Sequence, residues 1–309
     1  MADLKYSEYR LPRQMLADQV YDGHKSLHDD KMAEDLGFSG APIEGPTHFS
    51  QFDLLLHELF GDAWFERGCI SSHYRNMVVE GEEVRAFVEI PAEGATITRI
   101  GAEKRDGTEV LTGTASIGPD HGDTEIGRRI ARLEPSDQLV ILSDLEVGRK
   151  GAGNPEDAIM DFDQYMGALY PFSLNDKLAV ITEMHPYYTL EGAADSPWGK
   201  PVIPMEMISV LSNYQNQSGF KSRGPAVGMF AGLEIRLING PVFVNHPYKI
   251  EREIVALSES RRTESNWVRS SIYDAESGDL ACEVILNSAT LKASYEKYEE
   301  DAKALGKKL

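Results

Sequence analysis

One order of sequence features occurs twice in this chain, and this repeat limits the folds that the chain can adopt. An acidic residue followed two positions later by histidine occurs at Asp22 and His24, and again at Glu183 and His185, 161 positions further on. After each pair come a Pro-containing loop, an apolar run with helical spacing and several strand-like runs. This order predicts two copies of one unit, each a helix packed against an antiparallel sheet.

The first copy has the clearer helix and strand patterns. Residues 47–60, THFSQFDLLLHELF, are apolar around so much of a helical circumference that other elements must surround this helix. Residues 105–108, Arg-Asp-Gly-Thr, have the composition of a hairpin turn. The strands are expected at residues 69–76, 77–81, 83–90, 95–104 and 109–117.

A charged, turn-rich stretch at residues 118–157 separates the copies, so we predict an N-terminal domain over 1–135 and a C-terminal domain over 136–309. The second copy should open with a short helix at 158–169 and contain a central helix at 205–217. Its strands are expected at 232–237, 248–257, 266–273 and 280–291, with an exposed helix at 292–309. The predicted fold class is α+β, with two curved antiparallel sheets that each wrap a long central helix and can pair edge to edge.

Charge and composition limit the partners. Of the 309 residues, 50 are acidic and 31 basic, for a formal net charge of −19, which argues against nucleic acid or an anionic membrane as partner. Cys69 and Cys282 are far apart and have no metal-binding spacing, which is typical of buried thiols in a reducing compartment. Neither a signal peptide nor an apolar run of bilayer length is evident, so a cytoplasmic location is expected.

The stretch from Asp22 to Gly45 resembles the MaoC-like hydratases and dehydratases, which include (R)-specific enoyl-CoA hydratases. The shared order is an acidic residue, a His-containing loop, an Ala-containing helix, Gly-Phe, Pro-Ile-x-Gly and a long apolar helix. In architecture the resemblance covers most of the chain, but in motif it covers only residues 20–50 and, more faintly, 181–210. It implies a double hot-dog fold, homo-oligomers, a CoA-linked acyl substrate, and neither cofactor nor metal.

Both copies depart from the family motif, in which four residues separate Asp from His. Here five residues separate Asp22 from His28, and the second copy has Tyr188 where the family has its His. Two alternatives to ordinary enoyl-CoA hydration therefore remain open. One is a thioesterase or a lyase on a non-CoA metabolite, built on the same scaffold. The other is a non-catalytic partner subunit.

The chemistry of the predicted reaction selects the candidate residues. Hydration of an unsaturated thioester needs a base, an acid and a donor that polarises the carbonyl, and a carboxylate, an imidazole and a helix N-terminus supply them. The catalytic candidates are Asp22, His24, His28, Glu183 and His185, and the substrate-binding candidates are Pro42, Glu44, Gly45 and Tyr188. Each also has an ordinary structural interpretation, such as a solvated loop acid for Glu44 and packing for Tyr188. No metal is expected, because the His spacings match no standard site.

The predicted function is therefore a hydro-lyase, a hydratase or dehydratase, that acts on an unsaturated or β-hydroxy acyl substrate. Either copy could hold the active site, because the first has two histidines near its acid and the second keeps the motif's Pro.

Overall fold

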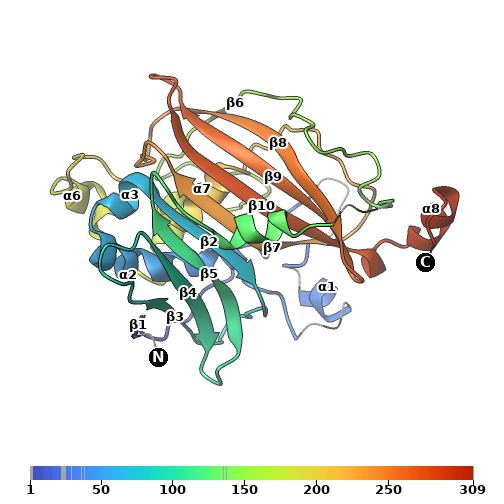
Figure 1. The fold of residues 1–309 in the computed structure, drawn as a ribbon, viewed down its shortest axis with the longest axis horizontal. Coiled ribbons are helices and arrows are strands. Elements are labelled where there is room, and N and C mark those ends of the chain that lie inside the picture. The colour runs from blue at the N-terminus through green and yellow to red at the C-terminus, as the bar shows by residue number, and fades with distance from the viewer. Residues whose placement is uncertain are drawn as a thin grey trace.

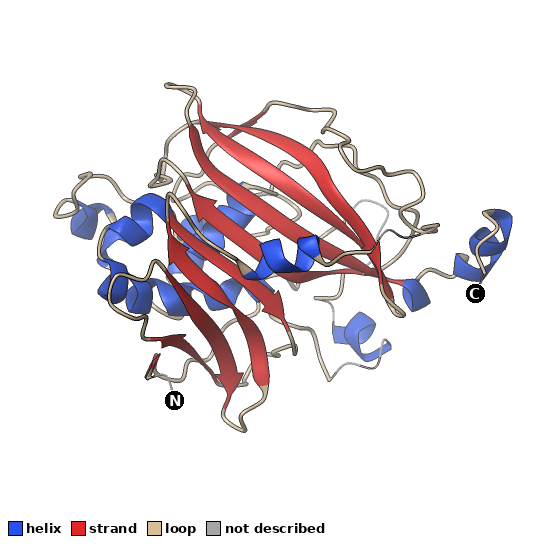
Figure 2. Ribbon diagram, viewed as in Figure 1, coloured by secondary structure: helices blue, strands red, loops and turns tan. Residues whose placement is uncertain are grey.

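One large antiparallel sheet organises the molecule (Figures 1 and 2). The computed structural model describes residues 3–21, 26–28, 30–35, 37, 39–134, 136 and 138–308. Within them the sheet has 10 strands in the order β1-β3-β4-β5-β2-β7-β10-β9-β8-β6. The first half of the chain supplies one side of this sheet and the second half supplies the other. The two half-sheets therefore pair edge to edge.

The strands of the first half are β1 (Leu4–Tyr6), β2 (Gly68–Tyr74), β3 (Val84–Glu89), β4 (Ile97–Lys104) and β5 (Glu109–Ile117). Those of the second half are β6 (Glu156–Ala158), β7 (Gly228–Leu237), β8 (Tyr248–Glu259), β9 (Thr263–Asp274) and β10 (Leu280–Leu291). The seam is the antiparallel pair β2 and β7, in register from Cys69 opposite Arg236 to His73 opposite Gly232. Because β2 pairs with β7, the edge strand of each half-sheet at the seam has a hydrogen-bonding partner.

The helices are short except for one. They are α1 (Asp30–Asp35), η1 (Gly45–Phe49), α2 (Ser50–Phe60), α3 (Ala63–Arg67), α4 (Glu125–Ala131), α5 (Leu174–Leu178), η2 (Pro186–Tyr188), α6 (Leu190–Ala193), α7 (Met205–Leu211), η3 (Lys292–Ser294) and α8 (Tyr298–Ala304). The 3-10 turn η1 leads directly into α2, the central helix of the first half. In the second half, α7 has the corresponding place. Within the described residues, no helix combines the length and apolar character that crossing a bilayer requires.

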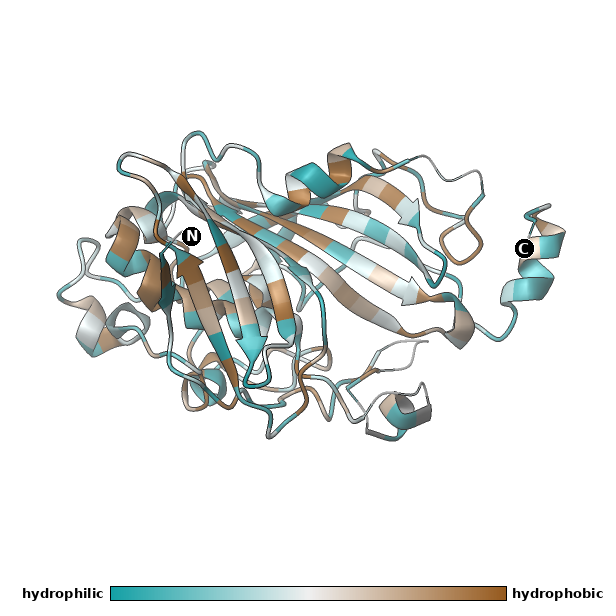
Figure 3. Ribbon diagram, turned by 60° about the horizontal axis from the view of Figure 1, so that its bottom comes forward, coloured by the Kyte–Doolittle hydropathy of each residue, from teal (hydrophilic) through white to brown (hydrophobic). Residues whose placement is uncertain are grey.

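The core lies between the sheet and the helices α2 and α7, which contact each other on one face of the sheet. Every residue of α7 is buried, and Phe52 and Leu56 of α2 are fully buried. The helix α4 packs on β2 and β7 from the opposite face, where Ile126 forms a smaller cluster with Trp267. Figure 3 shows how apolar and polar residues alternate along the strands, which places apolar side chains on the covered face.

The two halves repeat the same local geometry at the start of their central helices. The Ile43 N–H donates to the Val78 carbonyl at 2.7 Å, and the Ile203 N–H donates to the Val242 carbonyl at 2.8 Å. Ile203 therefore occupies the position of Ile43, at an offset of 160 residues. With this offset, Pro204 corresponds to Glu44. The duplication inferred from element order thus has a structural counterpart.

Several predicted elements differ from the structure. Residues 159–169 form turns and loop instead of the expected helix at 158–169. The backbone groups of Ile159 bond to the Tyr214 hydroxyl, and the Met160 carbonyl accepts from the Asn245 N–H, so these groups are not used within a helix. Residues 77–81 contribute only an isolated bridge at Val79 rather than a strand. The helix predicted over 205–217 ends at Leu211, and the tail forms η3 and α8 in place of one helix.

We predict that Gly113→Ala destabilises the sheet. A Cβ at Gly113 in β5 would lie 2.1 Å from the Ser71 carbonyl oxygen of β2, so the strands would have to separate. The free energy of unfolding should fall by about 1–3 kcal/mol, measured by urea denaturation. Gly228→Ala is the matched control in β7, because its nearest contact is Ser288 Oγ at 4.0 Å. Equal stabilities of the two variants would contradict this account of the sheet.

Candidate active site

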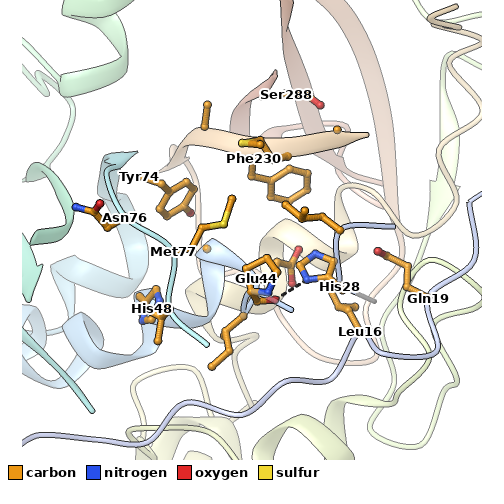
Figure 4. A pocket seen from close by; sticks show the side chains of 18 of the residues that line it. Leu16, Gln19, His28, Glu44, His48, Tyr74, Asn76, Met77, Phe230 and Ser288 are labelled. Atoms are coloured by element: carbon orange, nitrogen blue, oxygen red, sulfur yellow. Dashed lines mark hydrogen bonds between the residues drawn. The ribbon is translucent and has the colours of Figure 1, made fainter. Parts of the chain in front are cut away.

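A cavity of about 320 Å³ lies beside the seam of the sheet, below the ends of β2 and β7 (Figure 4). Its floor comes from the N-terminal segment and from the loop that precedes η1, and its roof comes from the strands. The lining residues include Leu16, Gln19, Tyr21, Leu27, His28, Pro42, Ile43, Glu44, Gly45, His48, Tyr74, Arg75, Asn76, Met77, Phe230 and Ser288. Four residues predicted from the sequence, His28, Pro42, Glu44 and Gly45, therefore line one cavity.

The hydrogen bonds of His28 define its neutral form. Its Nδ1 lies 2.7 Å from the carbonyl oxygen of Pro42. A carbonyl oxygen only accepts, so Nδ1 carries the hydrogen and Nε2 keeps its lone pair in the neutral ring. Burial lowers the pKa of His28, although the bond to Pro42 opposes this shift. At neutral pH the residue therefore has the electronic form of a general base.

Glu44 is a buried carboxyl group at the same cavity, with only 8% of its surface exposed. Burial raises the pKa of Glu44 to about 7, with Lys177 opposing and Glu206 reinforcing this shift. Charge is costly to bury, so the group holds its proton far more tightly than a surface glutamate does. Near neutral pH, Glu44 can consequently donate or accept a proton.

Because Gly45 has no side chain, the backbone at this position can lie close to the ring of Tyr74. A Cβ at this position would lie 2.5 Å from the ring of Tyr74, which lines the roof. Gly45 is also the first residue of η1, which continues into α2, so the partial positive charge of these helical turns points toward the cavity floor. The side chain of any other residue would push Tyr74 away and reshape the cavity.

A buried ion pair supports the cavity floor from below. Lys177 of α5 lies 3.0 Å from the Glu206 carboxylate of α7, and both side chains are almost completely buried. The same ammonium group donates a hydrogen bond of 3.1 Å to the hydroxyl of Thr47 in η1. These contacts tie the beginnings of the two central helices together. This network could not be predicted from the sequence, since its members are far apart and belong to no motif.

The second acid–histidine pair has a different environment and does not line the cavity. Glu183 forms an ion pair of 2.9 Å with Arg10 of the N-terminal segment. His185 accepts a hydrogen bond from the Tyr187 N–H at Nδ1, and its Nε2 lies 3.1 Å from Nδ1 of His57. Both ring nitrogens of His185 are engaged by protein groups. Burial, followed by the nearby His57, lowers the pKa of His185 to about 4.

Tyr188 belongs to a buried cluster around α2. Its hydroxyl donates a 2.5 Å hydrogen bond to Asp53, which also accepts one from the indole N–H of Trp64 at 2.9 Å. Asp53, Trp64 and Tyr188 are all fully buried. Burial raises the pKa of Asp53 to about 7, against the opposing effect of these two hydrogen bonds. Tyr188 thus serves the core at a distance from the cavity lining.

At the positions that correspond to Glu44 and Gly45, the second half has Pro204 and Met205, and both are buried. The Met205 side chain belongs to the main hydrophobic core. Where the first half has an ionisable carboxyl group and open space, the second half has packed apolar atoms.

Asp22 and His24 lie outside the described residues, so the structure does not place them. The neighbouring residues Tyr21 and Leu27 both line the cavity. Within the described part of the chain, no three His, Cys, Asp or Glu side chains are grouped as metal ligands.

The fold is similar to several solved structures. A protein described as a MaoC-domain dehydratase from Chloroflexus aurantiacus has 14% identity and a TM-score of 0.55, with coverage of 94% of this chain and 95% of that one. A MaoC-like dehydratase has 15% identity and a TM-score of 0.51, covering 93% and 97%. A conserved hypothetical protein from Mycobacterium tuberculosis with a double hot-dog fold has 11% identity and a TM-score of 0.55, covering 94% and 96%.

No family model matches the sequence, and no curated protein sequence matches it. At these identities the structural likeness defines the fold. The chain is a double hot-dog protein, which confirms the fold class predicted from the sequence.

We predict that Tyr188→Phe lowers stability most at high pH. The substitution removes the O–H that donates to Asp53, so the folded-state pKa of that carboxyl should rise further. A carboxyl with a raised folded-state pKa stabilises the protein at low pH, and this contribution is lost as the pH rises toward that pKa. Urea denaturation should show a loss of about 1–3 kcal/mol that is larger at pH 8 than at pH 6. An equal loss at both pH values would exclude this coupling.

Proposed function

We propose that the protein is a hydro-lyase of the MaoC-like type, which adds water to an unsaturated acyl thioester or removes it from a β-hydroxy one. One observation carries the proposal: a histidine with a free Nε2 lone pair, a carboxyl group with a pKa of about 7 and a glycine at a helical N-terminus line the same cavity. These are the base, the acid and the carbonyl-binding element that the reaction requires. The fold shared with MaoC-like dehydratases supports it.

In the hydration direction, Nε2 of His28 takes a proton from water while the water oxygen attacks the β-carbon. The electrons of the double bond move toward the thioester, and its carbonyl oxygen is stabilised at the backbone of Gly45. Protonated Glu44 then donates its proton to the α-carbon. The imidazolium and the carboxylate return to their starting forms when a proton passes from His28 to Glu44 through solvent.

Asp22 remains a candidate for the carboxyl role beside Glu44. The motif resemblance favours Asp22, and the described cavity lining favours Glu44. We place the active site in the first half, because its cavity is open and the corresponding second-half positions are filled by Pro204 and Met205. Glu183, His185 and Tyr188 then have structural roles.

A thioester of coenzyme A is the form of substrate that we propose. Arg75 lines the cavity and keeps 48% of its side chain exposed, so its guanidinium can contact a phosphate at the mouth. Its only ion-pair partner among the described residues is Glu109, at 3.9 Å. A negatively charged protein needs such a local cation to hold a phosphorylated ligand.

We predict that His28→Gln reduces hydration of short enoyl-CoAs by about 10²–10⁴-fold in kcat, because the general base is lost. The decrease in absorbance of the conjugated thioester measures the reaction. His73→Gln is the matched control, since its Nδ1 also donates to a backbone carbonyl, that of Ala231, and His73 does not line the cavity. Unchanged hydration by the His28 variant would contradict the assignment. Release of free thiol by the native protein would instead identify a thioesterase, and no turnover of either kind would favour a partner subunit.

The pH dependence tests Glu44 separately. Donation to the α-carbon needs the protonated carboxyl, so kcat/KM for hydration should fall as the pH rises through about 7. Neutral His28 is also required, and because burial lowers its pKa, the acid limb should lie at a lower pH than the titration of an ordinary histidine. Glu44→Gln should remove the alkaline limb and most of the activity. If the alkaline limb persists in this variant and vanishes in Asp22→Asn, Asp22 is the acid.

A further inference from the structure

A second cavity, of about 180 Å³, adjoins the first one deeper in the second half. Gln19, Tyr21, Phe230 and Ser288 line both cavities, so a ligand held at His28 and Glu44 can extend past Phe230 into this space. In Figure 4, Phe230 and Ser288 lie on the opposite side of the first cavity from Asn76, which is an exposed lining residue. The second cavity therefore continues the path of a bound acyl group.

The space exists because the second central helix is short. The helix α7 ends at Leu211, whereas β9 and β10 each have 12 residues and extend beyond it. Turns from Ser212 to Ser218 replace further helix, and the inner face of these two strands stays uncovered there. A longer helix would have filled this volume with side chains.

The inner face of β9 and β10 carries polar groups where an alkyl-binding cavity would carry apolar ones. Asn266 of β9 lies directly opposite Ser288 of β10, and Ser270 lies opposite Val284 on the same face. Among the described residues, the side chains of Asn266, Ser270 and Ser288 have no hydrogen-bond partner. Ser270 is buried, with 4% of its surface exposed. Asn266 and Ser288 are half-buried, and all three side chains line the cavity, so a ligand in this space can exchange hydrogen bonds with them.

None of the described residues that line the second cavity carries a charge. The polar side chains, besides the three on the strands, are Gln19, Tyr21, Tyr170, Ser212, Asn213, Asn216 and Ser218, and the others are apolar. A carboxylate or ammonium group in this space would lack a counter-ion. The lining is suited to a neutral group that both donates and accepts hydrogen bonds.

We propose that the second cavity is a binding site for the distal end of the acyl group, and that this end is an uncharged, hydroxylated or amide-bearing tail. The proposal extends the proposed hydro-lyase function by naming its substrate class. A plain alkyl tail would leave Asn266, Ser270 and Ser288 unsatisfied, and sites built to hydrogen-bond a hydroxyl discriminate strongly against analogues that lack it. A carboxylate tail would lose its hydration without gaining a cation.

The test compares saturated acyl-CoAs of four to eight carbons that end in a methyl, a hydroxyl or a carboxylate. Isothermal titration calorimetry on the full chain should show that, at the best length, the hydroxyl-terminated ligand binds at least about tenfold more tightly than its methyl and carboxylate counterparts. The double substitution Asn266→Leu and Ser270→Ala should reduce this preference to near unity. Ser271→Ala, on the outer face of the same strand, is the matched control and should keep the preference.

The binding measurement separates this proposal from the proposed reaction. Selective binding of the hydroxyl tail without any hydration of enoyl-CoAs would support the site and reject the hydro-lyase. If the protein hydrates enoyl-CoAs but binds the methyl-terminated ligands as tightly as the hydroxyl-terminated ones or more tightly, the polar site is rejected and the hydro-lyase function is retained. Tighter binding of the carboxylate, or an unchanged preference in the Asn266 and Ser270 variant, would overturn the site as well.

Discussion

The buried ion pair between Lys177 and Glu206 is the contact on which the arrangement of the two halves depends. It joins α5 to the first turn of α7 and reaches Thr47 at the start of the first central helix. Two charges removed from water are stable only as a pair, and removal of one partner typically costs about 3–5 kcal/mol. The pair therefore fixes where both central helices begin. The pair also acts on Glu44: burial raises the pKa of this carboxyl, Lys177 opposes the shift, and Glu206 reinforces it.

The two copies of the unit differ in how they use the same position. In the first half, Glu44 and Gly45 leave a cavity at the start of α2, and in the second half Pro204 and Met205 close it. The second half has its cavity at a different place, beyond the end of α7, where β9 and β10 extend further than the helix. The two cavities adjoin each other and share the lining residues Gln19, Tyr21, Phe230 and Ser288.

The sequence predicted the architecture better than the site. Element order and apolar periodicity depend on local spacing, so the central helix before Phe60 and the strands of both halves could be predicted. The helix predicted at 158–169 was wrong because the backbone of Ile159 and Met160 bonds to Tyr214 and Asn245, which are distant in sequence. The motif match between His24 and His185 could not reveal that both nitrogens of His185 are engaged by Tyr187 and His57. Lys177 and Glu206 were missed because they meet only in the folded chain.

A carboxyl group with a pKa near 7 requires a rigid surrounding, since mobile walls would admit water and return the pKa to its ordinary value. Residues of both halves hold α2, the helix that follows Glu44 and η1. Tyr188 and Trp64 hold Asp53 within the central helix of the first half, and His185 joins His57 in the same packed region. In the proposed arrangement, the acid–histidine motif of the second copy supports the central helix of the first. On this proposal, the first copy keeps an open cavity at the start of its central helix, and the second copy contributes contacts that hold this helix in place.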